Sequence, residues 1–200
     1  MTTIGLEKAI IGAGGFASEI RVALGLPNIK FFVDDQYMKV ESGVYGLSQF
    51  DPEKYEVVVA IGNPIDRANI VQRLPKNTKY FTFIDPTAQI HGSDVSIGEG
   101  SIICAGTIIT TNIKIGKHAH LNLLTTIGHD TQIGDYFTTS PGAKISGNCN
   151  IEDRVYFGTN SSVRQKIDIC SDVTIGLNAG IVKNITEPGI YVGVPAKKIK

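Results

Sequence analysis

The chain has 200 residues, enough for one or two domains with proper hydrophobic cores, and 42% of them are hydrophobic. Its 19 Lys and Arg balance its 19 Asp and Glu, so the charge does not indicate binding to nucleic acid or to an anionic membrane. We expect a cytoplasmic protein, because no apolar run has transmembrane or signal-peptide character and the three cysteines are odd in number and lack metal-ligand spacing.

Residues 1–84 predict a small Rossmann-like α/β domain with a parallel sheet, because short apolar strands alternate with helical segments. The strands are expected at 8–11, 30–33, 56–61 and 79–84, and the first helix at 16–24. A second helix is expected to run to about residue 74 from Asn63, an N-cap residue followed by proline at the first helical position. Asp85-Pro86 marks the junction with a second domain at 85–200.

A glycine-rich segment connects the first strand to the first helix. It reads Gly12-Ala13-Gly14-Gly15-Phe16-Ala17 and matches the G-x-G-x-x-[GA] pattern in the strand–turn–helix context that the pattern requires. The glycines permit a tight turn and close approach of a ligand, and the N–H groups at the helix start attract an anion. Gly12, Gly14 and Gly15 are therefore candidates to bind the phosphates of a nucleotide or nucleotide sugar; the alternative is a tight turn without a ligand.

Polar residues follow two other strands at the same edge of the sheet, where ligands bind in open α/β proteins. Asp34 and Asp35 end the second strand, and the Gly62-Asn63 turn follows the third. In a dinucleotide enzyme an acidic residue at this place holds a ribose hydroxyl, but the domain is too short for two mononucleotide-binding halves, which argues against NAD. Arg67, one turn into the second helix, is either a phosphate ligand or a solvated surface residue.

From Ile97 to Ile181, the residue at every sixth position is apolar with one exception. The series is Ile97, Ile103, Ile109, Ile115, Leu121, Ile127, Ile133, Thr139, Ile145, Ile151, Phe157, Val163, Ile169, Ile175 and Ile181. Helices repeat every 3.6 residues and ordinary strands every two, so neither needs this period. A hexapeptide repeat indicates a parallel β-helix, in which three hexads form one coil. A partial coil is expected before the series, near Ala88 and Ile90.

A second inward position lies two residues before each large one, because strand alternation places both on the same face. It holds mostly small or β-branched residues such as Ala119 and Thr125. Glycine often follows the large residue, at Gly98, Gly116, Gly128, Gly134, Gly158 and Gly176. We expect these glycines at the corners of the coil, where a positive φ costs glycine little.

His129 is the candidate catalytic residue of the β-helix. It lies two residues past an inward isoleucine, hence at a corner and pointing away from the core, and Asp130 can orient its ring. Gly147 follows one full coil later, so it leaves a gap beside the imidazole and can offer an N–H group. A base beside an N–H donor is the minimum arrangement for acyl transfer, because one takes the nucleophile's proton and the other stabilises the oxyanion.

A zinc site is the competing use of histidine in a β-helix, as in the γ-class carbonic anhydrases. His118 and His120 flank the inward Ala119, so both point outward at different points of a corner, and no H-x-x-x-x-H spacing is present. We therefore expect no metal. His91 has no evident partner, and a surface position is the default for it.

Eight segments spread over nearly the whole chain carry a resemblance to a known family. They are Gly12-Ala13-Gly14-Gly15-Phe16-Ala17-Ser18-Glu19, Val33-Asp34-Asp35, Ala60-Ile61-Gly62-Asn63, Leu121-Asn122, Gly128-His129-Asp130, Ile133-Gly134-Asp135, Ser140-Pro141-Gly142-Ala143 and Gly193-Val194-Pro195-Ala196-Lys197. With them the chain resembles the bacterial hexapeptide-repeat sugar acetyltransferases of the sialic acid O-acetyltransferase-like family. Within that family it is most similar to the N-acetyltransferases of nucleotide-linked 4-amino-4,6-dideoxy sugars.

The resemblance implies a left-handed β-helix, a homotrimer, and active sites between neighbouring subunits. It implies that His129 is the general base for the acceptor amine, that Asp130 orients it, and that the Gly147 N–H meets the thioester carbonyl. Asn122 matches a family asparagine near the acceptor sugar. The nucleotide sugar would be held by the glycine-rich loop, with Asp34 or Asp35 at the base.

The resemblance also implies that acetyl-CoA is the co-substrate and lies along the β-helix between subunits. It would reach Gly147, Gly158, Gly176, Pro195 and Lys197. One departure concerns a histidine that relatives often carry two residues before the Ser-Pro-Gly-Ala segment, where this chain has Thr138. Thr139, the polar exception in the hexad series, adjoins it, and we expect substrate near this place.

These observations predict an acetyl-CoA-dependent N-acetyltransferase of polysaccharide biosynthesis. It would acetylate the 4-amino group of a UDP- or dTDP-linked 4-amino-4,6-dideoxy sugar by direct transfer, because no cysteine or serine is placed as a nucleophile. O-acetylation of a sugar hydroxyl, as on a sialic acid, needs the same base and N–H donor and remains an alternative. A non-catalytic trimer that binds a nucleotide sugar is another.

Overall fold

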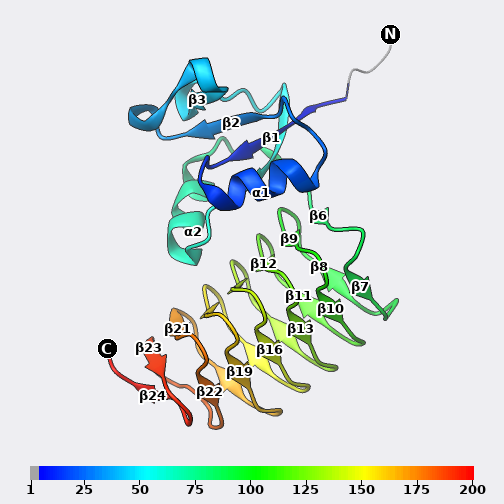
Figure 1. Cartoon of the computed structure of the whole chain (residues 1–200), viewed down its shortest axis with the longest axis vertical. Coiled ribbons are helices and arrows are strands. Elements are labelled where there is room, and N and C mark those ends of the chain that lie inside the picture. The colour runs from blue at the N-terminus through cyan, green and yellow to red at the C-terminus, as the bar shows by residue number, and fades with distance from the viewer. Residues whose placement is uncertain (1–4) are drawn as a thin grey trace.

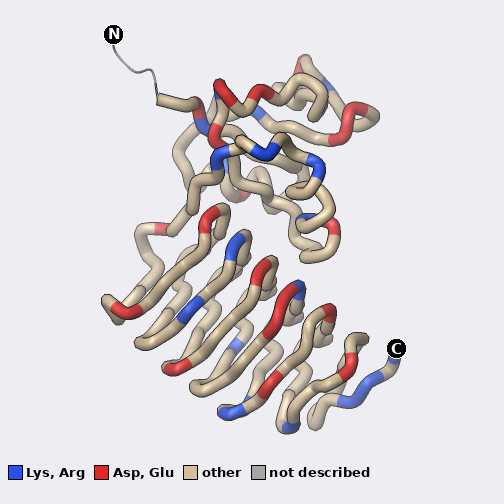
Figure 2. Tube along the Cα trace, turned by 180° about the vertical axis from the view of Figure 1, so that it is seen from behind, with Lys and Arg blue, Asp and Glu red and all other residues tan. Residues whose placement is uncertain are grey.

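The computed structural model describes residues 5–200 and shows an N-terminal α/β part beside the first coils of a long β-helix (Figure 1). The chain runs from the N-terminal sheet in blue into the coils in green and ends in red at the far end of the β-helix. Basic and acidic residues are interspersed over both parts (Figure 2). Among residues 5–200, none of the helices combines the length and the apolar character that a bilayer crossing requires.

The N-terminal part is a parallel sheet with two α-helices. Its elements are β1 (Glu7–Ile11), α1 (Gly15–Ala23), β2 (Lys30–Val33), β3 (Val44–Gly46), β4 (Tyr55–Val59), α2 (Pro64–Arg73) and β5 (Lys79–Tyr80), with 3₁₀ turns η1 (Asp35–Tyr37), η2 (Val40–Ser42) and η3 (Leu47–Gln49) between β2 and β4. The strands lie in the order β3-β2-β1-β4-β5. Because β1 lies between β2 and β4, the loops after β1 and β4 face one crevice at the carboxyl edge of the sheet.

The elements predicted before residue 79 are confirmed, with ends that move by no more than two residues. Asn63 caps α2 as expected, because its side-chain oxygen accepts from the N–H groups of Ile65 at 2.9 Å and Asp66 at 3.1 Å. β3 was not predicted, since a three-residue strand ending in glycine carries little pattern.

The strand expected at 79–84 is divided between the two parts. Lys79–Tyr80 pairs with β4, whereas Phe83–Ile84, here β6, pairs with Ile102–Ile103 in the β-helix. The chain changes sheets between residues 80 and 83, so a strand of the β-helix lies just before the boundary expected at residue 85.

The β-helix has three faces, which we call A, B and C in chain order, joined by A–B, B–C and C–A corners. Face A holds β6 (Phe83–Ile84), β9 (Ile102–Ile103), β12 (His120–Leu121), β15 (Thr138–Thr139), β18 (Tyr156–Phe157), β21 (Val173–Ile175), β23 (Gly189–Val192) and β24 (Lys197–Lys198). Face B holds β7 (Gln89–Ile90), β10 (Ile108–Ile109), β13 (Thr126–Ile127), β16 (Lys144–Ile145), β19 (Ser162–Val163) and β22 (Gly180–Ile181). Face C holds β8 (Ser96–Ile97), β11 (Lys114–Ile115), β14 (Gln132–Ile133), β17 (Asn150–Ile151) and β20 (Asp168–Ile169).

The hexad series forms the core of the β-helix, and residues eighteen apart stack in parallel register, as Ile109, Ile127 and Ile145 do. Every member of the series from Ile103 onward is buried. The polar exception, Thr139, costs little because its hydroxyl accepts from the Asn122 N–H at 2.9 Å and bonds the Thr125 hydroxyl at 2.8 Å.

The predicted reason for the corner glycines is wrong. None of the six has a positive φ; that conformation falls two residues later, on residues such as His118 (φ 54°) and Asp130 (φ 59°). Glycine is needed because consecutive coils approach closely. A Cβ on Gly98 would lie 2.5 Å from the carbonyl carbon of Gly116, and one on Gly128 would lie 2.6 Å from the nitrogen of Gly147.

Arg67, on α2, is completely buried where the N-terminal part meets the β-helix. Its guanidinium is surrounded by acceptors from both parts, at 2.6–3.2 Å. They are the carbonyl oxygens of Ile61, Gly62, His118, Tyr136 and Phe137, Nδ1 of His120 and the hydroxyl of Thr138. Since a guanidinium has five N–H donors, this set leaves none for a phosphate.

Both sequence-based interpretations of Arg67 are therefore wrong: it is neither a phosphate ligand nor a solvated residue. Burial lowers the pKa of its guanidinium to about 9, so it remains a cation at neutral pH. Among the described residues no carboxylate forms an ion pair with it. Its charge is compensated by backbone dipoles that belong to both parts of the chain.

Arg67→Met keeps an apolar stem but leaves several buried carbonyl groups without donors. We expect the free energy of unfolding, measured by urea denaturation, to fall by about 3–5 kcal/mol. Arg73→Met on the same helix is the control, because the Arg73 side chain is 56% exposed and its partner Asp34 lies at the surface, so the urea midpoint should barely move. Equal losses in the two variants would contradict the role of Arg67 as the link between the parts.

Candidate active site

The sequence-predicted site residues fall at separate places in one chain. His129, Asp130 and Gly147 lie at the B–C corner, whereas Asn122, Gly158 and Gly176 lie at the A–B corner, with strand β13 between Asn122 and His129. The glycine-rich loop, Asp34, Asp35, Gly62 and Asn63 belong to the N-terminal crevice. Pro195 and Lys197 lie at the C-terminal end of the β-helix.

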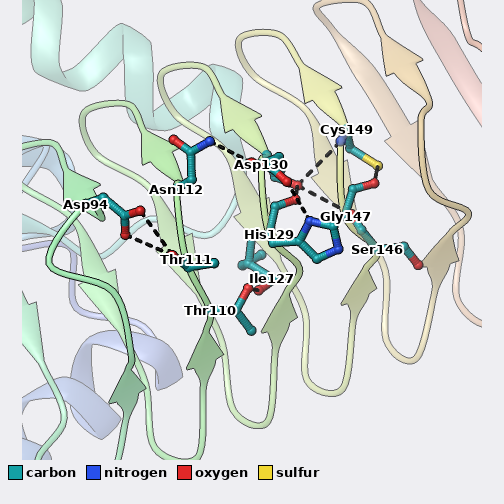
Figure 3. Close-up of polar contacts among 11 residues, drawn as sticks. Asp94, Thr110, Thr111, Asn112, Ile127, His129, Asp130, Ser146, Gly147 and Cys149 are labelled. Carbon is teal, nitrogen blue, oxygen red and sulfur yellow. Dashed lines mark hydrogen bonds and ion pairs between the residues drawn. The ribbon is translucent and has the colours of Figure 1, made fainter.

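His129 and Asp130 form a hydrogen-bonded pair on the outside of the B–C corner (Figure 3). Nδ1 of His129 lies 2.6 Å from Oδ2 of Asp130, and the two side chains are 58% and 44% exposed. Hydrogen bonds from His129 and from Asn112 lower the pKa of Asp130, which is therefore ionised at neutral pH. An ionised carboxylate only accepts, so Nδ1 carries the proton of the neutral ring and Nε2 keeps a lone pair.

The structure brings Gly147 directly beside this ring, as the eighteen-residue spacing predicts. A Cβ on Gly147 would lie 2.8 Å from Nε2 and 2.9 Å from Cε1 of His129. Within residues 5–200 the Gly147 N–H has no hydrogen-bond partner. At the same hexad position, but at the C–A corner, the N–H groups of Lys117 and Asp135 bind carboxylate oxygens at 2.7 and 2.8 Å. An N–H group at this hexad position can therefore bind an oxygen that carries negative charge.

The glycine-rich loop has one position that requires glycine. Gly12 has φ +107°, and a Cβ there would lie 3.0 Å from the carbonyl oxygen of Ala60. Gly14 is the N-cap of α1 and offers no side chain to the first N–H groups of the helix. A pocket of about 440 Å³ opens beside Ala13 and Gly14 and reaches Tyr37.

The polar residues around this crevice already have partners within the chain. Asp34 pairs with Arg73, and Asp35 accepts from the Ser48 N–H at 3.2 Å and from its hydroxyl at 2.9 Å. The side chain of Asn63 caps α2, and the Gly62 carbonyl accepts from Arg67. Their roles toward a nucleotide stay predictions, since a ligand would have to share or replace these contacts.

The A–B corner is connected to α1 by a pocket of about 490 Å³, whose lining includes Gly15, Phe83, Cys104 and Leu123. Asn122 precedes Leu123, and its side-chain oxygen accepts from the Leu123 N–H at 2.7 Å. This pocket therefore extends from the start of α1 to the neighbourhood of Asn122.

Further along the A–B corner, glycine again marks close coil contact. A Cβ on Gly158 would lie 2.7 Å from the nitrogen of Leu177, and one on Gly176 would lie 2.7 Å from Cγ1 of Val192. Pro195 and Lys197 line a pocket of about 410 Å³. The proposed contacts of all four residues with acetyl-CoA stay predictions.

The expectation of substrate near Thr138 and Thr139 stays a prediction, and the side chains of both residues already have partners within the chain. Both side chains are buried on face A, and the Thr138 hydroxyl accepts from Arg67 at 2.8 Å and donates to the Gly62 carbonyl at 3.1 Å. Thr138 therefore helps to join the two parts of the chain.

His118 and His120 point out of the coil, as predicted, but they are buried against the N-terminal part. Burial lowers the pKa of His118 to about 4 and also lowers the pKa of His120, so both rings are neutral. His118 packs against Tyr80 and Tyr136, and His120 against Phe16. In the described part of the chain, no three His, Cys, Asp or Glu side chains gather as a metal site.

Sequence reasoning missed Asn112, whose side chain donates to Asp130 at 2.6 Å. Asn112 precedes Asp130 by the same eighteen residues that separate His129 from Gly147. Counting back one coil from Asp130, as well as forward from His129, would have found it.

The chain is similar to known proteins in sequence and in structure. Residues 9–74 match the model of the PglD N-terminal domain. GDP-perosamine N-acetyltransferase of Escherichia coli O157:H7 is 36% identical over 110 residues, which are 54% of this chain and 49% of that protein. The chain thus spans about half the length of this curated relative.

Solved structures match over nearly the whole chain. WeeI from Acinetobacter baumannii AYE has a TM-score of 0.87 at 30% identity, covering 98% of this chain and 100% of WeeI. The acetyltransferase domain of PglB from Neisseria gonorrhoeae FA1090, in complex with acetyl coenzyme A, has a TM-score of 0.85 at 31% identity, with 98% and 100% coverage. The chain belongs to the hexapeptide-repeat sugar acetyltransferase family. A Rossmann-like sheet followed by a left-handed β-helix is confirmed as its fold.

Gly147→Ala tests the contact between Gly147 and the His129 ring. The added methyl group meets a half-exposed side chain that can turn into solvent, so we expect the ring to move away from Gly147 while the unfolding midpoint stays nearly unchanged. Gly158→Ala is the contrast, because its methyl group meets backbone and should destabilise the fold by about 1–3 kcal/mol. Crystal structures and thermal unfolding of the two variants provide the measurement, and an unmoved ring in Gly147→Ala would contradict the geometry.

Proposed function

We propose that this chain is an acetyl-CoA-dependent N-acetyltransferase that acts on the 4-amino group of a nucleotide-linked 4-amino-4,6-dideoxy sugar. The observation that carries the proposal is the His129–Asp130 pair beside the unpartnered Gly147 N–H. The acetyl coenzyme A complex of the PglB domain and the activity of the curated perosamine relative support the donor and the class of acceptor. The sequence predicts UDP or dTDP as the nucleotide of the acceptor. GDP is a third candidate, because that relative is a GDP-perosamine N-acetyltransferase.

In the proposed reaction, the acceptor amine attacks the thioester carbonyl carbon directly. Nε2 of His129 takes a proton from the amine, while the Gly147 N–H stabilises the negative charge that develops on the carbonyl oxygen. Collapse of the tetrahedral intermediate breaks the C–S bond, and the imidazolium returns its proton to the departing thiolate. The products are an amide and free CoA. Asp130 remains ionised and stabilises the imidazolium throughout.

The proposal places the nucleotide at the glycine-rich loop, with Asp34, Asp35, Gly62 and Asn63 around it. The pocket between α1 and the A–B corner gives the sugar a path from the loop toward Asn122. Because Asn122, Gly158 and Gly176 lie at a different corner from His129, we propose a homotrimer in which one subunit's A–B corner meets its neighbour's B–C corner. Cytoplasmic placement is part of the proposal, since both co-substrates are cytoplasmic metabolites.

His129→Asn should remove the base while keeping a small polar side chain. We expect kcat to fall by about 10²–10⁴-fold with UDP-, dTDP- or GDP-linked 4-amino-4,6-dideoxy sugars, measured by release of free thiol from acetyl-CoA. His91→Asn is the control, since His91 is an exposed histidine on an earlier coil. Undiminished turnover in His129→Asn would contradict the proposed role of His129 as the general base. Turnover with free sialic acid alone would favour O-acetylation, and nucleotide binding without thiol release would favour a binding protein.

Gly15→Asp tests whether the start of α1 binds phosphate. The space around Gly15 is open, with no atom within 4 Å of an added Cβ, so the substitution acts through its charge. Repulsion of the diphosphate should raise KM for the nucleotide sugar by about tenfold and leave KM for acetyl-CoA unchanged. Gly15→Asn has the same size without the charge and is the matched control. Identical KM values in the two variants would favour a tight turn without a ligand.

A further inference from the structure

Asn112 occupies the αL position of the B–C corner one coil before Asp130. The two residues have φ values of 52° and 59°, so they are stacked in the same backbone conformation. The Nδ2 group of Asn112 donates to Oδ1 of Asp130 at 2.6 Å, while Oδ2 of the same carboxylate binds Nδ1 of His129 at 2.6 Å (Figure 3). Each oxygen of Asp130 therefore has a fixed partner on a different side.

Asn112 is itself held by the preceding coil. The Asp94 carboxylate accepts from the Thr111 hydroxyl at 3.1 and 3.0 Å. A hydrogen bond from the Asn112 backbone N–H also lowers the pKa of Asp94. Side-chain contacts join Asp94 to Thr111, and the adjoining Asn112 to Asp130 and His129, across consecutive coils (Figure 3).

This arrangement restricts a side chain that is otherwise free to rotate. Asp130 is 44% exposed, and a carboxylate with one anchored oxygen can still turn about its side-chain bonds. A second anchor on the other oxygen removes that freedom. The amide N–H also prefers an ionised acceptor, and an ionised Asp130 keeps the ring proton on Nδ1.

We propose that Asn112 is a positioning residue that fixes the Asp130 carboxylate and, through it, the tautomer and direction of the His129 ring. The proposal rests on the proposed function for its effect on rate, but its effect on the ring is independent of any activity. Outer partners of a catalytic histidine act in this way because they decide which ring nitrogen keeps the lone pair.

Few charged groups lie near the His129 ring, so the effect of a change at position 112 on the ring can be measured. Asp130 is the charged group beside it, and Asp94 is the next carboxylate along the corner, close enough to feel the charge of Asp130. The coil on the other side presents Gly147 and Asn148, which carry no charge. A new charge at position 112 therefore acts on a small, defined set of groups.

Asn112→Gly is the first test, because glycine accepts the positive φ of this position and removes only the amide. We expect kcat to fall by about three- to thirtyfold, with both KM values within about twofold of the original chain. Asn160→Gly makes the same substitution at φ 54° on another coil and is the control for thermal stability. If Asn112→Gly and Asn160→Gly lose the same thermal stability but only Asn112→Gly loses kcat, unfolding is excluded as the cause of the lower kcat.

Asn112→Asp is the second test, since it keeps the size of the side chain and replaces the donor by a carboxylate. We expect a similar loss of kcat. A carboxylate at this position cannot donate to Asp130 and repels it, so the second anchor of Asp130 is lost.

Nitrogen-15 NMR of the imidazole of His129, assigned with His129→Asn, reads the ring directly. The original chain should show a protonated Nδ1 and an unprotonated Nε2, and Asn112→Gly should show a mixture of tautomers. Unchanged ring signals in both Asn112 variants overturn the proposal, whatever the rates. If the original chain transfers no acetyl group, the proposed function fails, while the same NMR comparison still decides the role of Asn112.

Discussion

The two parts of the chain are joined through one buried guanidinium. Arg67 makes hydrogen bonds to the loop after β4 and to consecutive coils of the β-helix. Removing a cation from water costs several kcal/mol, and the hydrogen bonds of the guanidinium offset that cost. Arg67 also makes a geometric contribution. Its planar group fits one relative placement of the two parts and leaves donors unpaired in others.

This link also connects the fold to the candidate substrate site. The Gly62 carbonyl that accepts from Arg67 belongs to the turn that borders the N-terminal crevice, and the same carbonyl accepts from Thr138 on face A. The edge of the crevice is thus held against the coil by two donors. Whatever binds at the glycine-rich loop meets the β-helix at a set distance, which an enzyme that joins two substrates requires.

Much of the fold could be predicted because each coil of the β-helix appears in the sequence as a regular repeat of apolar residues. Each inward residue repeats after six positions and each neighbour across coils after eighteen, so counting alone brought Gly147 beside His129. The same count would have shown Asn112. Arg67 could not be predicted, since an arginine in the first turns of a surface helix looks the same whether it meets water or a second domain. The contacts of Thr138 could not be predicted for the same reason, because they come from the docking of the two parts.

The glycines show a different limit of sequence reasoning. Their positions were predicted, but their reason was not, because φ depends on how each corner is built and the distance between coils depends on their stacking. The corner places its αL residue two positions after the glycine, which leaves residues such as Asn112 and Asp130 pointing outward from a rigid turn. A corner of this kind can hold a series of hydrogen-bonded polar side chains on successive coils without disturbing the core, because the inward positions on either side remain apolar.

The exposure of the B–C corner bears on how the proposed chemistry could work. His129 is 58% exposed in a single chain, and oxyanion stabilisation by one N–H group is weak while water competes for the same oxygen. The proposed acetyl transfer therefore needs a cover over this corner. Substrate supplies part of it, and the residues at the A–B corner that match the family's binding positions cannot reach His129 within one coil. Under the proposed function, a neighbouring subunit supplies the rest, and the exposed histidine of the single chain is half of a site.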